Sequence, residues 1–372
     1  MADFAALAVP GVQALRPYEP GKPVETLERE LGIREAVKLA SNENSLGPSP
    51  RAVEAARQAL GNLHIYPDGN GLALKEALAE RHGVAPEQVT LGNGSNEVLE
   101  LVARTWLAPG RNAVYSRHAF AVYPLVVQAV SAEGRAAPAR PADADQPYGH
   151  DLDAMTARVD ADTRVVFVAN PNNPTGTWLR GDALERFIAR VPAETLVVVD
   201  EAYAEYVEQP DYPDTTRWLN RFPNLLVTRS FSKIHGLAGL RLGYSVSSVA
   251  VAELVNRVRQ PFNVNALAQA AGLAAISDTG HVAESVRMNR EGLEQLGTGL
   301  QQRGIGFIPS VGNFITFEAR EAPGTVYEGL LREGVIVRPV ANYGLPTHLR
   351  VTVGTPTENE RFLRALDAVL KA

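Results

Sequence analysis

The chain contains no cysteine, which excludes disulfide bonds, thiolate metal ligands and cysteine nucleophiles. It also has no apolar run long enough to cross a membrane and no signal-peptide pattern at its start. Basic residues are not in excess, because 36 Lys and Arg face 42 Asp and Glu, a net charge of −6. A mildly acidic chain disfavours nucleic acid and anionic membranes as partners. We therefore expect a soluble cytoplasmic protein.

The seven histidines form neither an H-x-H nor an H-E-x-x-H pattern, so no metal site is predicted. What is abundant is alternation between short apolar runs and helical patterns over much of the 372 residues. This alternation predicts a doubly wound α/β domain with a mainly parallel sheet. The predicted strands are Val89–Leu91, Val165–Ala169, Leu196–Val199 and Leu225–Thr228, and the helices between them include Glu97–Thr105 and Gly181–Val191.

The pattern changes after about Asn263. An Ala-rich helix and a longer amphipathic helix ending at Gly304 are followed by four strand-like runs and a final helix, Glu358–Lys371, with Thr357 as its N-cap. We therefore predict an N-terminal arm (residues 1–45, part of the small domain), a large domain (46–264) and a small α+β domain (265–372). The Ala-, Pro- and Asp-rich segment Ala132–Pro147 is interpreted as a surface loop of the large domain.

A lysine follows the last predicted strand of the large domain, in the string RSFSK that ends at Lys233. Ligands of open α/β sheets bind beyond the carboxyl ends of the strands, so Lys233, Ser230 and Ser232 are well placed to meet a phosphorylated ligand. Arg241 follows in the glycine-rich string GLAGLRLGY, and a guanidinium suits a phosphate. Taken alone, Lys233 fits a solvated surface lysine equally well.

An acid ends another apolar run, because Asp200 closes the three valines of VVVDEAYAEY. A carboxylate at that point needs a cationic partner or hydrogen-bond donors, since burying it unpaired is costly. A protonated pyridine nitrogen would be such a partner. A helix cap is the alternative, and this motif alone does not decide between the two.

Two polar turns also follow apolar runs, and each is compatible with an ordinary turn. In NPNNPTG, residues 170–176, two prolines and a glycine fix a rigid loop that would hold Asn173 as a side-chain donor. In LGNGSNEVLEL, the residues Gly94, Ser95 and Asn96 lie at a predicted helix start that suits an anion. The second string is not a G-x-G-x-x-G fingerprint, which disfavours nicotinamide cofactors.

In this order and in these motifs, Asn173, Asp200, Lys233 and Arg241 resemble the fold-type I pyridoxal phosphate enzymes. More narrowly, nearly the whole chain resembles the histidinol-phosphate aminotransferases, a family of class II aminotransferases. The strings that carry this narrower resemblance are SNENSLGPSP (41–50), IYPDG (65–69), NPNNPTG, DEAY, SFSKIHGLAGLRLGY and VIVRPVANYGLPTHLRVTVG (335–354).

The resemblance implies pyridoxal 5′-phosphate as the cofactor. Lys233 would hold it as a Schiff base and shuttle a proton between the substrate Cα and the cofactor C4′, while Asp200 would pair with the pyridine nitrogen. The other implied cofactor contacts are Asn173 and Tyr203 at the phenolic oxygen, Phe120 stacked on the ring where many members have tyrosine, and Ser230, Ser232, Arg241, Gly94, Ser95 and Asn96 at the phosphate. Tyr66 would reach the phosphate in the neighbouring subunit, which implies a homodimer with shared sites.

The resemblance also implies the substrate pocket. Arg350 would take the α-carboxylate of the amino donor and Arg338 the distal anion, with Tyr18, Asn44 and Asn313 lining the same pocket. A guanidinium suits either a carboxylate or a phosphate, so one pocket can serve glutamate and histidinol phosphate in turn. Taken individually, each arginine fits a surface ion pair more often than a ligand site.

The implied activity is ping-pong transamination between histidinol phosphate and 2-oxoglutarate in histidine biosynthesis. Two alternatives keep the cofactor but change the substrate: an aromatic amino acid aminotransferase and a phospho-threonine decarboxylase. A third is a ligand-sensing regulator on the same fold, which the absence of a helix-turn-helix pattern and of a basic patch disfavours.

Overall fold

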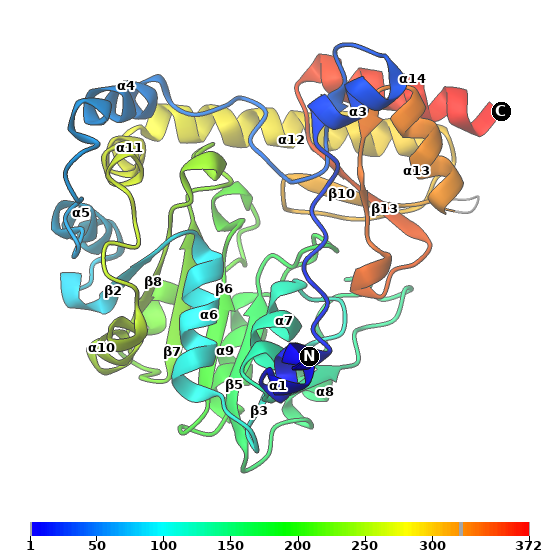
Figure 1. Cartoon of the computed structure of the whole chain (residues 1–372). Helices are drawn as coiled ribbons and strands as arrows, with labels where there is room; N and C mark the ends of the chain where they lie inside the picture. Colours follow the sequence, from blue (N-terminus) through cyan, green and yellow to red (C-terminus); the bar gives the residue numbers. More distant parts are fainter. Residues whose placement is uncertain (1, 320–322, 372) are drawn as a thin grey trace.

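The computed structural model describes residues 2–319 and 323–371, which form two lobes connected by the long helix α12 (Figure 1). The larger lobe surrounds a seven-stranded sheet, and the smaller lobe holds a second sheet and the C-terminal helices. The first residues run from α1, beside the large lobe, up to α3 on the small lobe. This arrangement confirms the expected α/β large domain with a smaller α+β domain.

The strands of the large sheet lie in the order β2-β8-β7-β6-β5-β3-β4. All neighbours are parallel, except that β8 runs antiparallel to both β2 and β7. Their bounds are β2 Val89–Gly92, β3 Asn112–Ser116, β4 Glu133–Ala137, β5 Thr163–Ala169, β6 Leu196–Asp200, β7 Leu225–Ser230 and β8 Gly243–Ser247. The four strands predicted from apolar runs are confirmed, whereas β3, β4 and β8 were not predicted.

Strand β4 shows that the interpretation of Ala132–Pro147 as a loop was wrong in its first part. The sequence EGRAA forms the edge of the sheet, pairs with β3, and exposes its first residues. An edge strand in this position needs few apolar side chains. Its composition therefore does not predict a strand, and the strand is recognised only by its main-chain pairing with β3.

Helices cover both faces of the large sheet, which explains why its central strands are almost entirely apolar. Along β5, Val165 and Phe167 pack into one layer, while Val166 and Val168 pack into the other. The first layer contains α6 (Ser95–Trp106), α7 (Val122–Ala129) and α10 (Val249–Val258); the second contains α5 (Leu72–His82), α8 (Leu152–Thr156), α9 (Gly181–Arg190) and α11 (Ala266–Ser277).

The same alternation separates two carboxylates at the end of β6. Asp200 lies on the side of α7, where the Tyr123 hydroxyl contacts it. The next residue, Glu201, extends to the opposite side and pairs with Arg229 at 2.5 Å, with both side chains buried. Arg229 directly follows Thr228, the register partner of Asp200. The ion pair therefore lies on the face of β6 and β7 opposite to the face that holds Asp200.

The small domain contains an antiparallel sheet of order β12-β13-β10-β9 and a parallel pair of β1 and β11. The bounds are β1 Val37–Lys38, β9 Phe307–Ile308, β10 Phe314–Glu318, β11 Val335–Ile336, β12 Arg338–Pro339, β13 His348–Thr352, α3 Val24–Leu31, α12 Thr279–Gln302, α13 Pro323–Arg332 and α14 Pro356–Lys371. Pairing of β1 with β11 attaches the N-terminal arm to this domain.

The helix α14 begins one residue before Thr357, and Thr355 Oγ1 accepts from the Glu358 N–H at 3.3 Å. Thr357 is therefore not the N-cap, because Pro356 takes the first helical position and places the cap before it.

Helix α11 packs with the large lobe, although it was assigned to the small domain. Ala268, Ala271 and Ala275 lie in the apolar core beneath the large sheet. A boundary at residue 264 stays a prediction, and this packing favours a boundary nearer α12. The remaining elements are α1 Phe4–Leu7, α2 Pro10–Gln13, α4 Pro50–Ala59 and the 3₁₀ turns Leu60–Asn62, Pro86–Gln88, Ala204–Tyr206, Thr215–Trp218, Ala238–Leu240 and Ala341–Tyr343.

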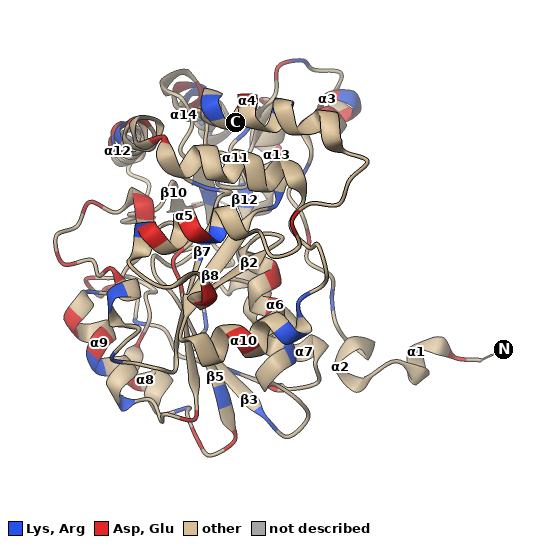
Figure 2. Cartoon of the chain, turned by 90° about the vertical axis from the view of Figure 1, so that its left-hand side faces the viewer, with Lys and Arg blue, Asp and Glu red and all other residues tan. Residues whose placement is uncertain are grey.

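The surface carries basic and acidic side chains interspersed, and α1 projects away from the body of the molecule (Figure 2). Within residues 2–319 and 323–371, no helix has the length and apolar character needed to span a membrane.

Candidate active site

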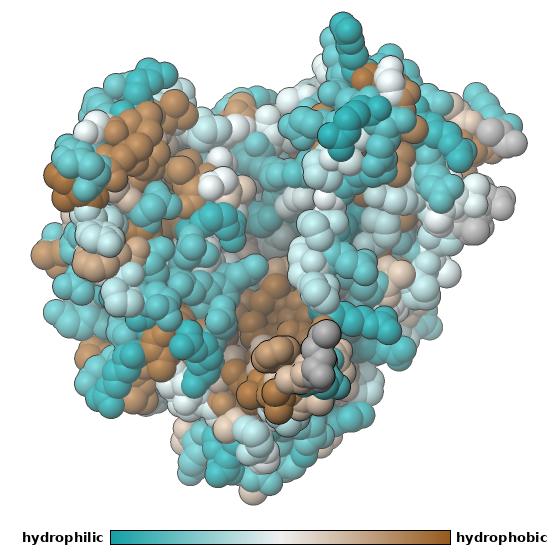
Figure 3. Space-filling model, in the orientation of Figure 1, coloured by the Kyte–Doolittle hydropathy of each residue, from teal (hydrophilic) through white to brown (hydrophobic). Residues whose placement is uncertain are grey.

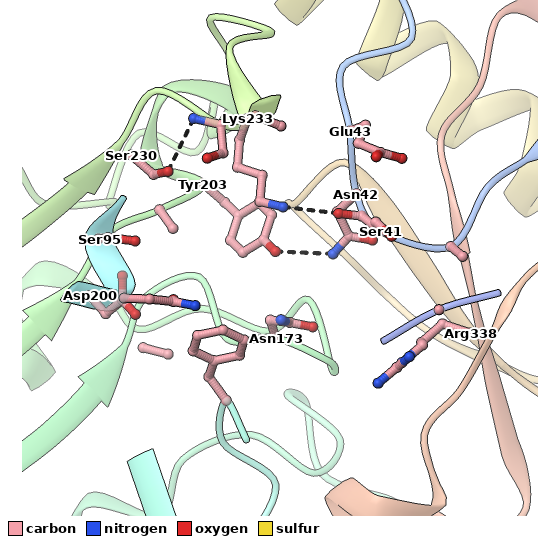
Figure 4. A pocket seen from close by; sticks show the side chains of 18 of the residues that line it. Ser41, Asn42, Glu43, Ser95, Asn173, Asp200, Tyr203, Ser230, Lys233 and Arg338 are labelled. Atoms are coloured by element: carbon pink, nitrogen blue, oxygen red, sulfur yellow. Dashed lines mark hydrogen bonds between the residues drawn. The ribbon is translucent and has the colours of Figure 1, made fainter. Parts of the chain in front are cut away.

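A buried cavity of about 390 Å³ lies at the carboxyl ends of β5, β6 and β7, between the large sheet and the small domain. It brings together thirteen of the side chains predicted from the sequence (Figure 4). They are Tyr18, Ser95, Asn96, Phe120, Asn173, Asp200, Tyr203, Ser230, Ser232, Lys233, Arg241, Arg338 and Arg350. The individual roles assigned to them remain predictions.

Lys233 follows β7 and reaches into the cavity, where its Nζ donates to the carbonyl oxygen of Ser41 at 3.0 Å (Figure 4). Burial, together with the nearby Arg350 guanidinium, lowers the pKa of Lys233 to about 7. A large fraction of the amine is therefore neutral at neutral pH, which is the nucleophilic form. The surface-lysine alternative is excluded, because the side chain points inward. His235, two residues on, is buried and stacks on Phe231 with 4.8 Å between the ring centres.

Asp200 ends β6 and is buried. Its two carboxylate oxygens accept hydrogen bonds of 2.9 Å from the Tyr123 hydroxyl and from Thr228 Oγ1. Burial raises the pKa of Asp200, while these two donors act to lower it. Neither of these two donors was predicted from the sequence. Thr228 is the cross-strand neighbour of Asp200 and could have been found from the strand register, whereas Tyr123 requires the position of α7.

Ser230, Ser232, Arg241 and the start of α6 form one polar end of the cavity. The Ser232 N–H donates to Ser230 Oγ at 3.1 Å, and Arg241 Nη1 lies 3.5 Å from Ser232 Oγ. Gly94 is required before α6, because its φ is +81° and a Cβ there would lie 2.6 Å from Arg241 Nη2. The free N–H groups of a helix start, two hydroxyls and a guanidinium together suit a phosphate.

Asn173 and Tyr203 form the middle of the cavity. Asn173 Oδ1 accepts a hydrogen bond from Arg350 Nη1. Tyr203 Oη accepts from Asn42 Nδ2 at 3.0 Å, and burial raises the pKa of Tyr203 to about 12. The hydroxyl is therefore protonated at neutral pH and can donate to a ligand oxygen.

Arg338 and Arg350 are register partners on β12 and β13, and both are buried. Arg350 Nη2 donates to the Ala40 carbonyl at 2.7 Å. Arg338 Nη2 donates to the Glu19 carbonyl at 2.6 Å, and its guanidinium lies 5.4 Å from the centre of the Tyr18 ring. The Nε atoms of both arginines are buried without a hydrogen-bond partner among the described residues. Neither arginine forms an ion pair within residues 2–319 and 323–371, so the pair is available to bind an anion.

Four predicted residues do not line the cavity: Gly94, which lies just before α6, and Asn44, Asn313 and Tyr66. Asn44 Nδ2 donates to the Ile234 carbonyl at 2.8 Å and to Ser285 Oγ at 3.0 Å, away from the ligand space. Asn313 Nδ2 donates to the carbonyls of Asn42 and Glu43 and so supports the wall from behind. Tyr66 is 78% exposed and stacks on Phe262.

The wall positions near the arm belong instead to residues that the sequence reading did not select: Ser41, Asn42, Glu43 and Tyr343. Asn42 has a φ of +53°, so the chain turns there and presents Asn42 rather than Asn44 to the cavity. A backbone reversal of this kind leaves no periodic signal in the sequence.

Within the described ranges, no group of three or more His, Asp or Glu side chains is arranged to hold a metal ion.

The family model for aminotransferases of class I and II matches residues 34–366. The chain is 62% identical over 372 residues to histidinol-phosphate aminotransferase 2 of Pseudomonas aeruginosa, covering 100% of this chain and 99% of that protein. It is 57% identical over 368 residues to the protein of the same name from Methylococcus capsulatus, covering 99% of each.

Solved structures with this fold include histidinol-phosphate aminotransferase from Sinorhizobium meliloti in complex with pyridoxal-5′-phosphate, with a TM-score of 0.89, 28% identity and 97% of each chain covered. Aspartate aminotransferase from Thermus thermophilus with maleate has a TM-score of 0.83 at 22% identity, covering 97% of this chain and 98% of that one, which is a likeness of fold. The chain therefore belongs to the class I and II aminotransferases, and within them it groups with the histidinol-phosphate aminotransferases.

Proposed function

We propose that the protein transfers an amino group between L-histidinol phosphate and 2-oxoglutarate, forming imidazole acetol phosphate and L-glutamate in L-histidine biosynthesis. The observation that carries this proposal is the placement in one cavity of Lys233 and two arginines, Arg338 and Arg350, which form no ion pair among the described residues. The similarity to histidinol-phosphate aminotransferases over the full chain supports the choice of substrate.

The residues present fit pyridoxal 5′-phosphate. The polar end formed by Ser95, Ser230, Ser232 and Arg241 would hold the phosphate, and Lys233 Nζ would hold the cofactor covalently. Asp200 would face the pyridine nitrogen, and the protonated nitrogen would supply a cationic partner for this buried carboxylate. Phe120 would pack on the ring, and Asn173 and Tyr203 would bond the phenolic oxygen. When bound, this cofactor supplies an electron sink for charge that develops at the substrate carbon.

The chain's own residues then perform three tasks. Arg350 and Arg338 bind the anionic groups of glutamate or of histidinol phosphate and orient the substrate. Lys233 Nζ takes the proton from the substrate Cα and returns it, for which its lowered pKa is suited. Tyr18 and Tyr343 line the cavity on the side of the arm and help to exclude water.

A second candidate keeps the same cofactor but changes the substrate to an aromatic amino acid. The observation that favours it is the set of aromatic rings in the cavity wall, Tyr18, Phe120 and Tyr343. These rings could pack on a phenyl ring as well as on an imidazole.

The two candidates are separated by half-reactions followed through the absorbance of the bound cofactor. We expect histidinol phosphate, as amino donor, to react faster, by kcat/KM, than phenylalanine. We expect 2-oxoglutarate then to restore the starting spectrum of the protein, because it takes up the amino group and becomes glutamate. A much faster reaction with phenylalanine would favour the second candidate. Absence of reaction with every amino donor would reject both.

We also propose a homodimer with shared sites, in the cytoplasm. Its support is a set of exposed apolar side chains: Phe4 and Leu7 on the projecting α1, Leu63, Ile65 and Tyr66 after α4, and Leu273 on α11. Figure 3 shows apolar residues gathered where α4 and α11 lie and around the N-terminal helix. Sedimentation at a mass near 40.1 kDa, that of one chain, would contradict the dimer.

A further inference from the structure

In the hydrogen bonds around Asn42, the chemistry of each group fixes which atom donates and which accepts. The Asn42 main-chain N–H donates to Thr352 Oγ1 at 2.9 Å, so the hydroxyl proton of Thr352 is free to donate elsewhere. Thr352 Oγ1 lies 3.1 Å from Asn42 Oδ1 and donates to it. The amide nitrogen of Asn42 then faces Tyr203 Oη at 3.0 Å (Figure 4). An amide nitrogen can only donate, so the oxygen of Tyr203 is the acceptor.

This direction leaves the hydroxyl proton of Tyr203 free to point elsewhere. The ring is fixed by an edge contact with Phe314 at 5.3 Å, and Tyr203 is buried except toward the cavity that it lines. Among the described residues, no acceptor for that proton is found on the protein. A hydroxyl that already accepts a hydrogen bond is also a stronger donor, because hydrogen bonds in a chain polarise one another.

The arm is built to hold the Asn42 amide in this place. The φ of Asn42 is +53°, in the left-handed region that asparagine tolerates better than most residues. Asn313, just before β10, donates to the Asn42 carbonyl at 3.1 Å, and Thr352 belongs to β13. The amide is therefore fixed by the small domain, while its target, Tyr203, belongs to the large one.

We propose that Asn42 is a positioning residue, which directs the hydroxyl proton of Tyr203 toward the phenolic oxygen of the bound cofactor under control of the small domain. The inference rests on the proposed function, because it requires pyridoxal phosphate in the cavity. It makes the donor strength of Tyr203 depend on the position of the arm. A displacement of the small domain would withdraw the Asn42 amide and so change the cofactor's protonation.

The test is the pH midpoint of the visible absorbance of the cofactor-loaded protein. A donor to an anionic oxygen weakens the hold of that oxygen on a neighbouring proton, so loss of the donor raises the midpoint. Asn42→Gly removes the amide and tolerates the positive φ. We expect it to raise the midpoint by about one pH unit. Tyr203→Phe should raise the midpoint at least as far.

Two further variants show whether Asn42 acts through Tyr203. In the double variant Asn42→Gly/Tyr203→Phe we expect the midpoint of Tyr203→Phe alone, because the proposal has the amide act on the cofactor through the Tyr203 hydroxyl. Asn42→Asp also tolerates the left-handed backbone, and its carboxylate would accept the Tyr203 proton, so the midpoint should again rise. Ser45→Ala is the matched control: Ser45 Oγ donates to the Val353 carbonyl at 3.0 Å, and this residue does not line the cavity. Its midpoint should not change.

An unchanged midpoint in both Asn42 variants, or additive shifts in the double variant, would overturn the inference while leaving the cofactor assignment intact. A wild-type protein that develops no visible band with the cofactor would overturn the assignment and the inference together. Melting temperatures of the same samples separate loss of folding from a shift in protonation, and if Asn42→Gly does not fold, Asn42→Asp carries the test.

Discussion

The two walls of the active-site cavity are built in different ways. On the cofactor wall, Asp200, Ser230 and Lys233 are at or just after the ends of adjacent strands of one sheet. On the substrate wall, Tyr18 comes from the N-terminal arm, and Arg338 and Arg350 come from strands of the small domain. A wall made by one sheet is specified by short local motifs, whereas a wall made by distant segments depends on long-range packing.

The two walls also differ in how far their polar groups are satisfied before a ligand binds. Asp200 already accepts from Tyr123 and Thr228. Arg338 and Arg350 each keep a buried Nε without a partner among the described residues. We therefore expect changes on the cofactor wall to affect cofactor retention and chemistry, and changes on the substrate wall to affect substrate binding with the cofactor in place.

The largest effect should come from Lys233→Ala. Loss of the amine removes both the covalent attachment and the proton carrier, so the half-reaction rate should fall by at least about 10³-fold. The visible spectrum of the bound cofactor should change, and the cofactor should leave on dialysis. Lys75→Ala is the control, because Lys75 lies on α5 outside the cavity. Unchanged spectra and rates in Lys233→Ala would contradict the assignment of Lys233 as the residue that holds the cofactor and transfers the proton.

A smaller effect is expected from Arg350→Lys on the other wall. A lysine cannot donate to Asn173 and the Ala40 carbonyl and also bind a carboxylate with a planar fork. The KM for glutamate and 2-oxoglutarate should rise by about 100-fold, while the cofactor stays bound. Arg140→Lys, at the exposed Arg140–Asp145 pair, should have no effect. Loss of cofactor in Arg350→Lys would break the distinction between the walls.

The smallest effect is a dependence of cofactor uptake on pH. The pKa of Lys233 in the folded, cofactor-free protein is about 7, lowered mainly by burial. Only the neutral amine attacks the cofactor, so below pH 7 the rate of covalent uptake should fall about tenfold per pH unit, and above it the rate should level off. Stopped-flow absorbance on the cofactor-free protein measures this. A rate that still rises tenfold between pH 9 and pH 10 would mean an ordinary, solvated lysine.

The sequence predicted the cofactor wall well because its residues sit in unbroken strings that follow apolar strands. Lys233, Asp200, Asn173 and Arg241 all reach one cavity from separate motifs. The positions that the sequence reading missed share a different property: each depends on a contact made across the fold. Tyr123 reaches Asp200 from α7, and Asn42 reaches Tyr203 from the arm.

The errors in the fold have the same origin. Strand β4 carries no apolar alternation because it lies at the edge, so only its pairing with β3 defines it. Helix α11 follows the change of pattern at Asn263, yet Ala268 and Ala271 pack under the large sheet. Order along the chain indicated which element comes next, but not which lobe the element joins.

At the ends of β6 and β7, successive side chains point to opposite faces of the sheet. Asp200 and Thr228 share one face of the sheet, where Asp200 lines the cavity, while their immediate neighbours Glu201 and Arg229 form an ion pair on the opposite face. Side chains along a strand alternate with a period of two, so inserting or deleting a single residue in either strand would exchange the two sets. Arg229 would then be driven into the cavity, and the carboxylate of Asp200 would be turned away from the ligand. A single-residue insertion should therefore be tolerated in the connections between these strands but not within β6 or β7.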